Sequence, residues 1–185
     1  LPMHDIPDVP DLIDKIIILE GGFTDHPDDR GGPTRWGITE AVARSHGYEG
    51  EMRDFPREQA AAIYRRNYWM RPGFDRVAQL APSLAADLFD TAVNMGSGTA
   101  ILFLQRALNA LNRNGRDYDD IAVDRKIGPR TLAALDAFLR RRGAKGEDVL
   151  LKAVEALQGA RYIELAERRS ANEAFLFGWL NKRIA

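Results

Sequence analysis

Cysteine is absent from the 185 residues, so the chain has no disulfide framework, thiol nucleophile or thiolate metal site. Long hydrophobic runs are also missing, and no window approaches the roughly 18 apolar residues of a membrane span. Neither sign of charge dominates, because 26 Lys and Arg face 27 Asp and Glu, so we expect no nucleic-acid partner. With 45% hydrophobic and 29% charged residues, the composition is that of a globular protein with one sizeable core or two small ones.

The first residues, "LPMHDIPDVPDLID", contain neither a basic segment nor an apolar segment following it, so they do not form a secretory signal. We therefore expect residues 1–10 to be a tail or linker. The protein is then expected to be made in the cytoplasm. The lack of cysteine suits that reducing compartment, and it equally suits a protein that later leaves it.

Helical periodicity covers most of the chain and predicts a mainly α fold. Between residues 23 and 38, three glycines and two prolines exclude a long helix and indicate turns with a small β-hairpin. Because only a short turn separates the helices at 83–96 and 99–112, these two should form a helical hairpin. The other helices are expected at 11–20 with Asp11 as N-cap and Gly21 or Gly22 as the stop, and at 39–47, 56–69, 128–143, 147–169 and 174–184.

Glu20 lies at the end of the first of these helices. At about 100° per residue, it falls on the same stripe as Ile13, Ile16 and Ile17. We expect a carboxyl at the rim of the core or partly buried in it. Burial and the negative end of the helix dipole would both favour the protonated acid, which is the state that a general acid needs. The alternative is a side chain that points outward and is solvated.

An acidic loop follows Glu20 at once and contains Asp25, Asp28 and Asp29. A helix-end acid that faces a loop acid is the arrangement for glycosidic bond hydrolysis, in which one carboxyl protonates the leaving oxygen. The other carboxyl orients water or balances the developing positive charge. Spacing alone leaves the three aspartates equivalent. Calcium binding is an alternative for such a loop, but it lacks the twelfth-position glutamate of an EF-hand.

The stretch "EGGFTDHPDDRGGPTRWGIT", residues 20–39, closely resembles the signature of glycoside hydrolase family 108. This family comprises lysozyme-like N-acetylmuramidases found mainly in phage and prophage endolysins. The resemblance continues through "AAAIYRRNYW", "LFDTAVNMGSGTAILFLQRALN", "VDRKIGPRTLAAL" and "GWLNKR". It implies a lysozyme-like catalytic half at 11–95 and a helical peptidoglycan-binding-like half at 96–185, packed as one globular unit.

The same resemblance assigns catalytic roles. Glu20 matches the catalytic glutamate of the family, and its spacing to Asp29 and Thr34 is similar to the Glu, Asp, Thr set that flanks the attacking water in phage lysozymes. The resemblance implies that Glu20 is the general acid, with inversion if a water fits between the carboxyl groups. No metal or cofactor is implied.

Two positions depart from the family pattern. Asp25 and His26 stand where the family has asparagine and aspartate, so the role of that family aspartate is open here. Asp124 and Arg125 replace an aspartate-glycine turn before "IGP". Arginine in a left-handed turn costs roughly 1 kcal/mol, so a different turn is an alternative at this position.

Aromatic side chains near these motifs are candidates for packing against sugar rings. Trp36 and Trp69 are the expected substrate-binding residues. Tyr64 and Tyr68 are weaker candidates, because they share a helical face with small alanines in a pattern equally typical of core packing.

Further candidates lie on the helix at 83–96, where Asp87, Asp90, Thr91 and Asn94 form a polar stripe. A solvent-exposed face explains the stripe by itself. The resemblance places this helix beside the substrate cleft, so Asp90 and Asn94 are expected to contact substrate.

The last helix, "AFLFGWLNKRIA", combines aromatic residues with terminal Lys182 and Arg183. Docking on the core is one interpretation, and contact with the outer membrane is the other.

The sequence therefore predicts a monomeric endolysin-type muramidase that acts on peptidoglycan after release through a holin-type lesion. The alternatives are a lytic transglycosylase and a non-catalytic peptidoglycan-binding or secretion-assisting protein.

Overall fold

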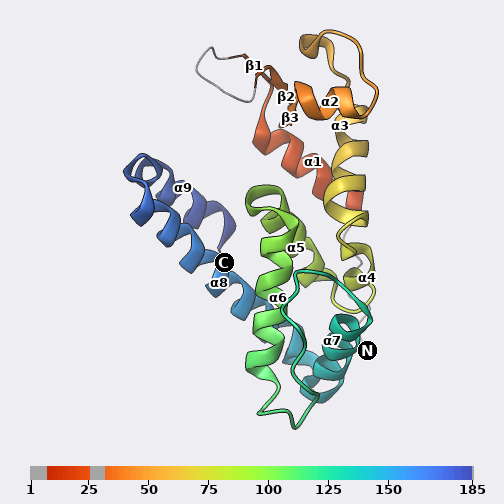
Figure 1. The fold of residues 1–185 in the computed structure, drawn as a ribbon, viewed down its shortest axis with the longest axis vertical. Coiled ribbons are helices and arrows are strands. Elements are labelled where there is room, and N and C mark those ends of the chain that lie inside the picture. The colour runs from red at the N-terminus through yellow and green to blue at the C-terminus, as the bar shows by residue number, and fades with distance from the viewer. Residues whose placement is uncertain (1–7, 26–31, 185) are drawn as a thin grey trace. The chain divides into compact units, whose positions relative to one another are not determined.

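The computed structural model describes residues 8–25 and 32–184 (Figure 1). The predicted fold class is confirmed, because helices dominate and the strands form one small antiparallel sheet. The chain divides into two compact units, Leu1–Asp75 and Arg76–Ala185.

The first unit places a short sheet at the end of its first helix (Figure 1). Its elements are α1 (Val9–Glu20), β1 (Phe23–Thr24), β2 (Thr34–Arg35), β3 (Ile38–Thr39), α2 (Glu40–Ser45), η1 (Met52–Asp54), α3 (Arg57–Tyr64) and the π-helical turn η2 (Arg65–Met70). Helix α4 (Phe74–Ala78) spans the division between the units.

Helix α1 begins earlier than its sequence predicts. Asp8, and not Asp11, occupies the N-cap position, and Asp11 lies in the first turn, where its charge favours the helix dipole. The predicted stop is confirmed, because Gly21 adopts φ +82° and its N–H donates to the carbonyl of Ile17 at 3.2 Å. An ion pair of 2.9 Å between Arg57 and Asp14 connects α3 to α1.

The sheet contains the predicted hairpin. Strand β2 pairs antiparallel with both β1 and β3, and the β2–β3 register places Arg35 opposite Ile38. The two residues between them, Trp36 and Gly37, both have positive φ, at +55° and +73°. A two-residue turn with both φ values positive matches the twist of the strands it joins, but it is unusual for a tryptophan. Trp36 is therefore held in a strained conformation.

The second unit is a helical assembly around one apolar core. It contains α5 (Pro82–Met95), α6 (Ser97–Leu111), α7 (Pro129–Arg142), η3 (Gly143–Lys145), α8 (Gly146–Arg168), η4 (Ser170–Asn172) and α9 (Glu173–Arg183). Helices α5 and α6 form the predicted hairpin around Gly96, which has φ +86°. Helix α8 packs against α5, α6, α7 and α9, and Figure 1 shows α9 running beside it.

Amide side chains on α6 hold the irregular segment between α6 and α7. Asn109 forms two hydrogen bonds with the backbone of Ile121, at 2.8 and 2.9 Å. Gln105 is fully buried, and it accepts from the backbone N–H of Arg125 at 2.9 Å and donates to Asp124 at 2.8 Å. Arg125 has φ +62°, so the left-handed turn is retained with arginine in place of glycine, at a cost of about 1 kcal/mol.

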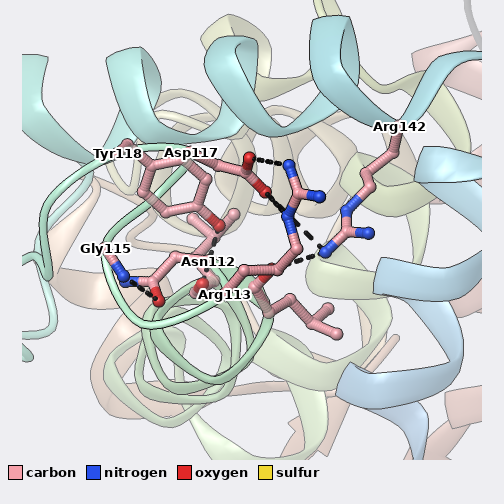
Figure 2. A network of polar contacts seen from close by, with 8 residues as sticks. Asn112, Arg113, Gly115, Asp117, Tyr118 and Arg142 are labelled. Carbon is pink, nitrogen blue, oxygen red and sulfur yellow. Dashed lines mark hydrogen bonds and ion pairs between the residues drawn. The ribbon is translucent and has the colours of Figure 1, made fainter.

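The same segment is fixed at its start by Asp117 (Figure 2). Arg113 hydrogen-bonds the Asp117 carboxylate, and Arg142 on α7 lies 3.7 Å from it. These cations hold the pKa of Asp117 below its usual range, chiefly through the Arg113 hydrogen bond. Tyr118, the residue after Asp117, donates to the carbonyl of Leu108 at 2.7 Å and so also anchors the loop to α6.

Only part of the polar stripe of α5 faces solvent, because Asn94 is exposed whereas Thr91 is not. Thr91 is fully buried, and one carboxyl oxygen of Asp87 is buried as well. The explanation is that α8 packs over this side of α5, while Arg183 on α9 pairs with Asp90 at 2.7 Å. Amphipathic periodicity identifies a polar face, but it does not reveal that another helix covers it.

Candidate active site

Glu20 is the last residue of α1, and its side chain is exposed. Ile13, Ile16 and Ile17 on the same stripe are buried, while Ile18 on the opposite side is 73% exposed. The predicted orientation of the helix is therefore confirmed. Partial burial of Glu20 is the part of the interpretation that is wrong, because the helix ends where the core ends and the carboxyl lies at its rim.

The hairpin turn approaches Glu20 closely. A Cβ atom built on Gly37 would lie 3.0 Å from both Cβ and Cγ of Glu20, and 2.2 Å from the hydroxyl oxygen of Tyr64. No side chain fits in this space, and the φ of +73° also favours glycine. Gly37 therefore allows three elements, α1, the β2–β3 turn and α3, to meet at the glutamate.

Tyr64 connects α3 to this turn. Its hydroxyl donates to the backbone carbonyl of Trp36 at 3.0 Å, and its side chain is buried. Burial raises the pKa of the Tyr64 phenol, and the charge of Glu20 raises it further, followed by a smaller effect of Tyr68. The phenol therefore stays protonated and keeps its role as donor at any pH at which the protein functions.

Trp36 is held by contacts on several sides. Its indole N–H donates to the carbonyl of Phe55 at 3.1 Å, and the guanidinium of Arg35 lies 5.1 Å from the ring centroid. The side chain is half-buried, so one part of the ring packs and another faces solvent. Trp36 is thus positioned beside Glu20 through the turn that both it and Gly37 form.

Thr34 is half-buried on β2, and its hydroxyl donates to the carbonyl of Gly32 at 3.2 Å. The sheet therefore carries Thr34 on the strand that leads into the turn against Glu20. Asp29 and His26 lie outside the described residues, so the predicted catalytic role of Asp29 stays a prediction.

Trp69 lies in η2 with 3% of its surface exposed. The described structure leaves little of the ring available to stack on a sugar, and packing in the core accounts for its place. Asp90 and Asn94 belong to the second unit, and their predicted substrate contacts stay predictions. There, Asp90 pairs with Arg183, and Asn94 donates to the Asp90 carbonyl at 2.7 Å.

The sequence identifies Gly37 only as one of three glycines in the loop, and it ranks Tyr64 too low. A glycine between the short segments Thr34–Arg35 and Ile38–Thr39 is a turn signal that could have singled out Gly37. Contact between Tyr64 and a turn 28 residues away has no local signature.

Among residues 8–25 and 32–184, no group of three or more His, Cys, Asp or Glu side chains is arranged to hold a metal ion. In the same part of the chain, none of the helices has the length and hydropathy required to cross a bilayer.

A glutamate at a helix end beside a small antiparallel sheet, within a mainly helical chain, is the architecture of a lysozyme-like glycoside hydrolase. The family model of glycosyl hydrolase 108 matches residues 13–96, and a predicted peptidoglycan domain matches residues 99–184. Residues 13–96 therefore form a lysozyme-like domain of the glycosyl hydrolase 108 family, and residues 99–184 form a C-terminal peptidoglycan domain.

A solved structure has a similar fold. SagA of Brucella abortus is 25% identical with a TM-score of 0.66, and the match covers 94% of this chain and 88% of SagA. No curated protein sequence matches the chain.

Proposed function

We propose that this glycoside hydrolase is a muramidase, which hydrolyses the β-1,4 bond between N-acetylmuramic acid and N-acetylglucosamine in peptidoglycan. The observation that carries the proposal is the junction at Glu20, where α1, the β2–β3 turn and Tyr64 meet around one exposed carboxyl. The family match supports glycoside hydrolysis, and the second domain supports peptidoglycan as the partner.

In this mechanism Glu20 protonates the glycosidic oxygen as the bond to the leaving sugar breaks. Its carboxyl is accessible, which a general acid in an open cleft requires, because the substrate itself must displace water from it. The rigid turn at Gly37 and the buried phenol of Tyr64 fix the backbone on one side of the acid. The position of the proton donor is thereby set before substrate arrives.

Asp29 and Thr34 complete the proposal on the opposite side of the sugar ring. Asp29 orients the attacking water and balances the positive charge that develops on the ring, and Thr34 supplies a second contact to that water. A water between the two carboxyl groups leads to inversion at the anomeric carbon. Trp36 is the proposed platform for one sugar, because aromatic faces pack on the apolar faces of pyranose rings.

The test is clearance of a suspension of purified peptidoglycan by the full chain and by Glu20→Gln. The exposed loop residue Glu49 provides a matched control through Glu49→Gln. We expect Glu20→Gln to lose at least about a hundredfold in rate, the usual scale for a general acid, and Glu49→Gln to keep the full rate. Retention of the full rate by Glu20→Gln would exclude the assignment.

Mass spectrometry of the products tests the reaction type. Hydrolysis gives reducing ends, whereas a lytic transglycosylase gives anhydro-muropeptides. Binding of peptidoglycan without any new ends would instead indicate a non-catalytic protein.

The endolysin role is a further part of the proposal, and the residues that resemble phage and prophage endolysins support it. As an endolysin, the protein is made in the host cytoplasm, acts as a monomer and reaches the wall through a holin-type lesion. Expression with and without a holin is the direct test, since lysis should require the holin.

A further inference from the structure

A cationic pocket lies between α6 and α8 in the second unit, and its volume is about 330 Å³. Arg106 on α6, Arg161 on α8 and Arg125 from the loop before α7 all line it. A single carboxylate, Glu164, lies among these lining residues, and it pairs with Arg161 at 2.9 Å. With three arginines and one glutamate, the pocket lining has a net charge of +2.

These two charges have no carboxylate of their own. The side chains of Arg106 and Arg125 form no ion pair within residues 8–25 and 32–184. Three guanidinium groups at one pocket repel one another, so the arrangement favours a ligand that carries negative charge. Guanidinium groups bind carboxylates and phosphates through paired hydrogen bonds, which gives such a pocket selectivity for planar or tetrahedral anions.

Hydrogen bonds to the backbone hold Arg125 in place at the pocket. Buried Gln105 accepts from the Arg125 N–H at 2.9 Å and donates to Asp124 on one side and to the carbonyl of Lys126 on the other. This brace holds Arg125 at φ +62°, a conformation that glycine adopts without strain. Arginine is present here despite the strain that glycine would avoid. This indicates that the guanidinium at the pocket has a function of its own.

We propose that this pocket binds the free carboxylates of the peptidoglycan stem peptide. The inference rests on peptidoglycan as the partner, but not on the chemistry at Glu20, since every pocket residue lies within the C-terminal domain match. The N-acetylated sugars of the glycan are uncharged, whereas the stem peptide carries several carboxylates. Leu102, Leu157 and Ala160 also line the pocket and suit the methyl groups of its alanine residues.

The binding test is calorimetry of the full chain with a synthetic stem tetrapeptide, L-Ala-D-Glu-diaminopimelate-D-Ala. Arg125→Gly removes the guanidinium and relieves the backbone strain, so it should fold at least as stably as the wild type. We expect Arg125→Gly to weaken binding about tenfold, as does amidation of the peptide carboxylates. Arg116→Gly is the matched control, because it removes an exposed loop arginine outside the pocket and should leave the affinity unchanged.

Two outcomes would overturn the inference. One is equal affinity of wild type and Arg125→Gly for the tetrapeptide, or equal affinity for its amidated form. The other is binding of a glycerol-phosphate polymer at the pocket without binding of the peptide, which would identify a phosphate polymer as the ligand.

A second assay separates this inference from the proposed muramidase activity. With murein whose stem carboxylates have been converted to amides, wild type should clear as slowly as Arg125→Gly, with a higher KM and an unchanged kcat. Glu20→Gln should fail on both mureins and still bind the tetrapeptide. If wild type is inert on both mureins but binds the peptide through Arg125, the muramidase proposal fails and the inference stands.

Discussion

Gly37 lies directly against Glu20, so close that a Cβ atom on the glycine would come within 3.0 Å of two side-chain carbons of the glutamate. The contact joins a turn of the sheet to the end of α1. The contact therefore fixes the position of the Glu20 side-chain base, from which the carboxyl extends into solvent. The same Cβ atom would also lie 2.2 Å from the hydroxyl oxygen of Tyr64.

Substitution of Gly37 by alanine should consequently damage both stability and activity. The positive φ costs about 1 kcal/mol for any L-residue, and the methyl group displaces Tyr64 or the turn in addition. We expect a fall in Tm of several degrees and a loss of peptidoglycan clearance larger than the loss of folded protein explains. Thermal unfolding and turbidity measured on the same samples provide the check.

Gly22→Ala is the control for that experiment, because a Cβ there would meet no described atom within 4 Å and Gly22 is not at positive φ. The double variant Gly37→Ala/Tyr64→Phe should recover part of the stability, because removing the hydroxyl opens space for the methyl group. No recovery would mean that the strain comes from the backbone alone.

Tyr64→Phe by itself tests the hydrogen bond to the Trp36 carbonyl. We expect it to cost about 1 kcal/mol of unfolding free energy, the usual scale for a buried hydrogen bond. Because the bond fixes the turn against Glu20, kcat should fall several-fold while KM changes less. Tyr48→Phe is the matched control, since the phenol of this half-buried residue also donates to a backbone carbonyl, at 2.8 Å, but lies on the segment after α2. Equal kcat values for Tyr64→Phe and Tyr48→Phe would contradict a role of Tyr64 in the active site.

Sequence patterns predict those features that local chemistry determines. The helix stops at Gly21, Gly96 and Gly143 are examples, because glycine adopts the positive φ of a helix C-terminus without strain. The hairpin near residues 23–38 and the orientation of α1 follow from turn residues and periodicity in the same way.

Other features depend on contacts between distant segments and could not be predicted. The approach of Tyr64 to Gly37 requires α3 to lie beside α1, and no spacing in the sequence encodes that. Thr91 looked exposed because its neighbours are polar, yet α8 covers it. Arg125 adopts a left-handed turn that its residue type disfavours. Buried Gln105 stabilises this turn through hydrogen bonds to Arg125 and Asp124.

Asp87 makes the stability of the second unit depend on pH. Burial raises the pKa of its carboxyl from 3.8 to about 7, and the negative charges of Glu155 and Asp90 add to the effect. The phenol of Tyr162 on α8 also interacts with the charge of Asp87. In the native state Asp87 therefore holds its proton up to about neutral pH, whereas the unfolded chain releases it near pH 3.8.

Between these two pKa values the native state binds more protons than the unfolded state, so the Asp87 contribution lowers stability as pH rises. Asp87→Asn stays neutral throughout, and its stability relative to wild type should increase from about pH 4 to about pH 7 and then level off. The pKa difference sets an upper limit of roughly 4 kcal/mol on that increase. Urea unfolding of both proteins at several pH values gives the difference curve. A flat curve for Asp87→Asn would contradict the shift.

The exposed aromatic residues of α9 provide the test of outer-membrane contact, which we propose from the sequence of that helix. Phe177 is 81% exposed and Phe175 59%, whereas Arg183 and Ile184 at the end of the helix contact Asp90 and the surface near Gly159. The helix also packs on α8 through Trp179, whose ring stacks on Tyr162 at 5.3 Å between centroids, so the exposed Phe177 can be changed without loss of folding. Phe177→Ser should keep its Tm and its rate on purified peptidoglycan, but it should act several-fold more slowly on intact Gram-negative cells, because an exposed phenylalanine is the part that enters lipid. Permeabilising the outer membrane first should abolish that difference. Equal rates on intact cells would assign the exposed ring no role in membrane contact.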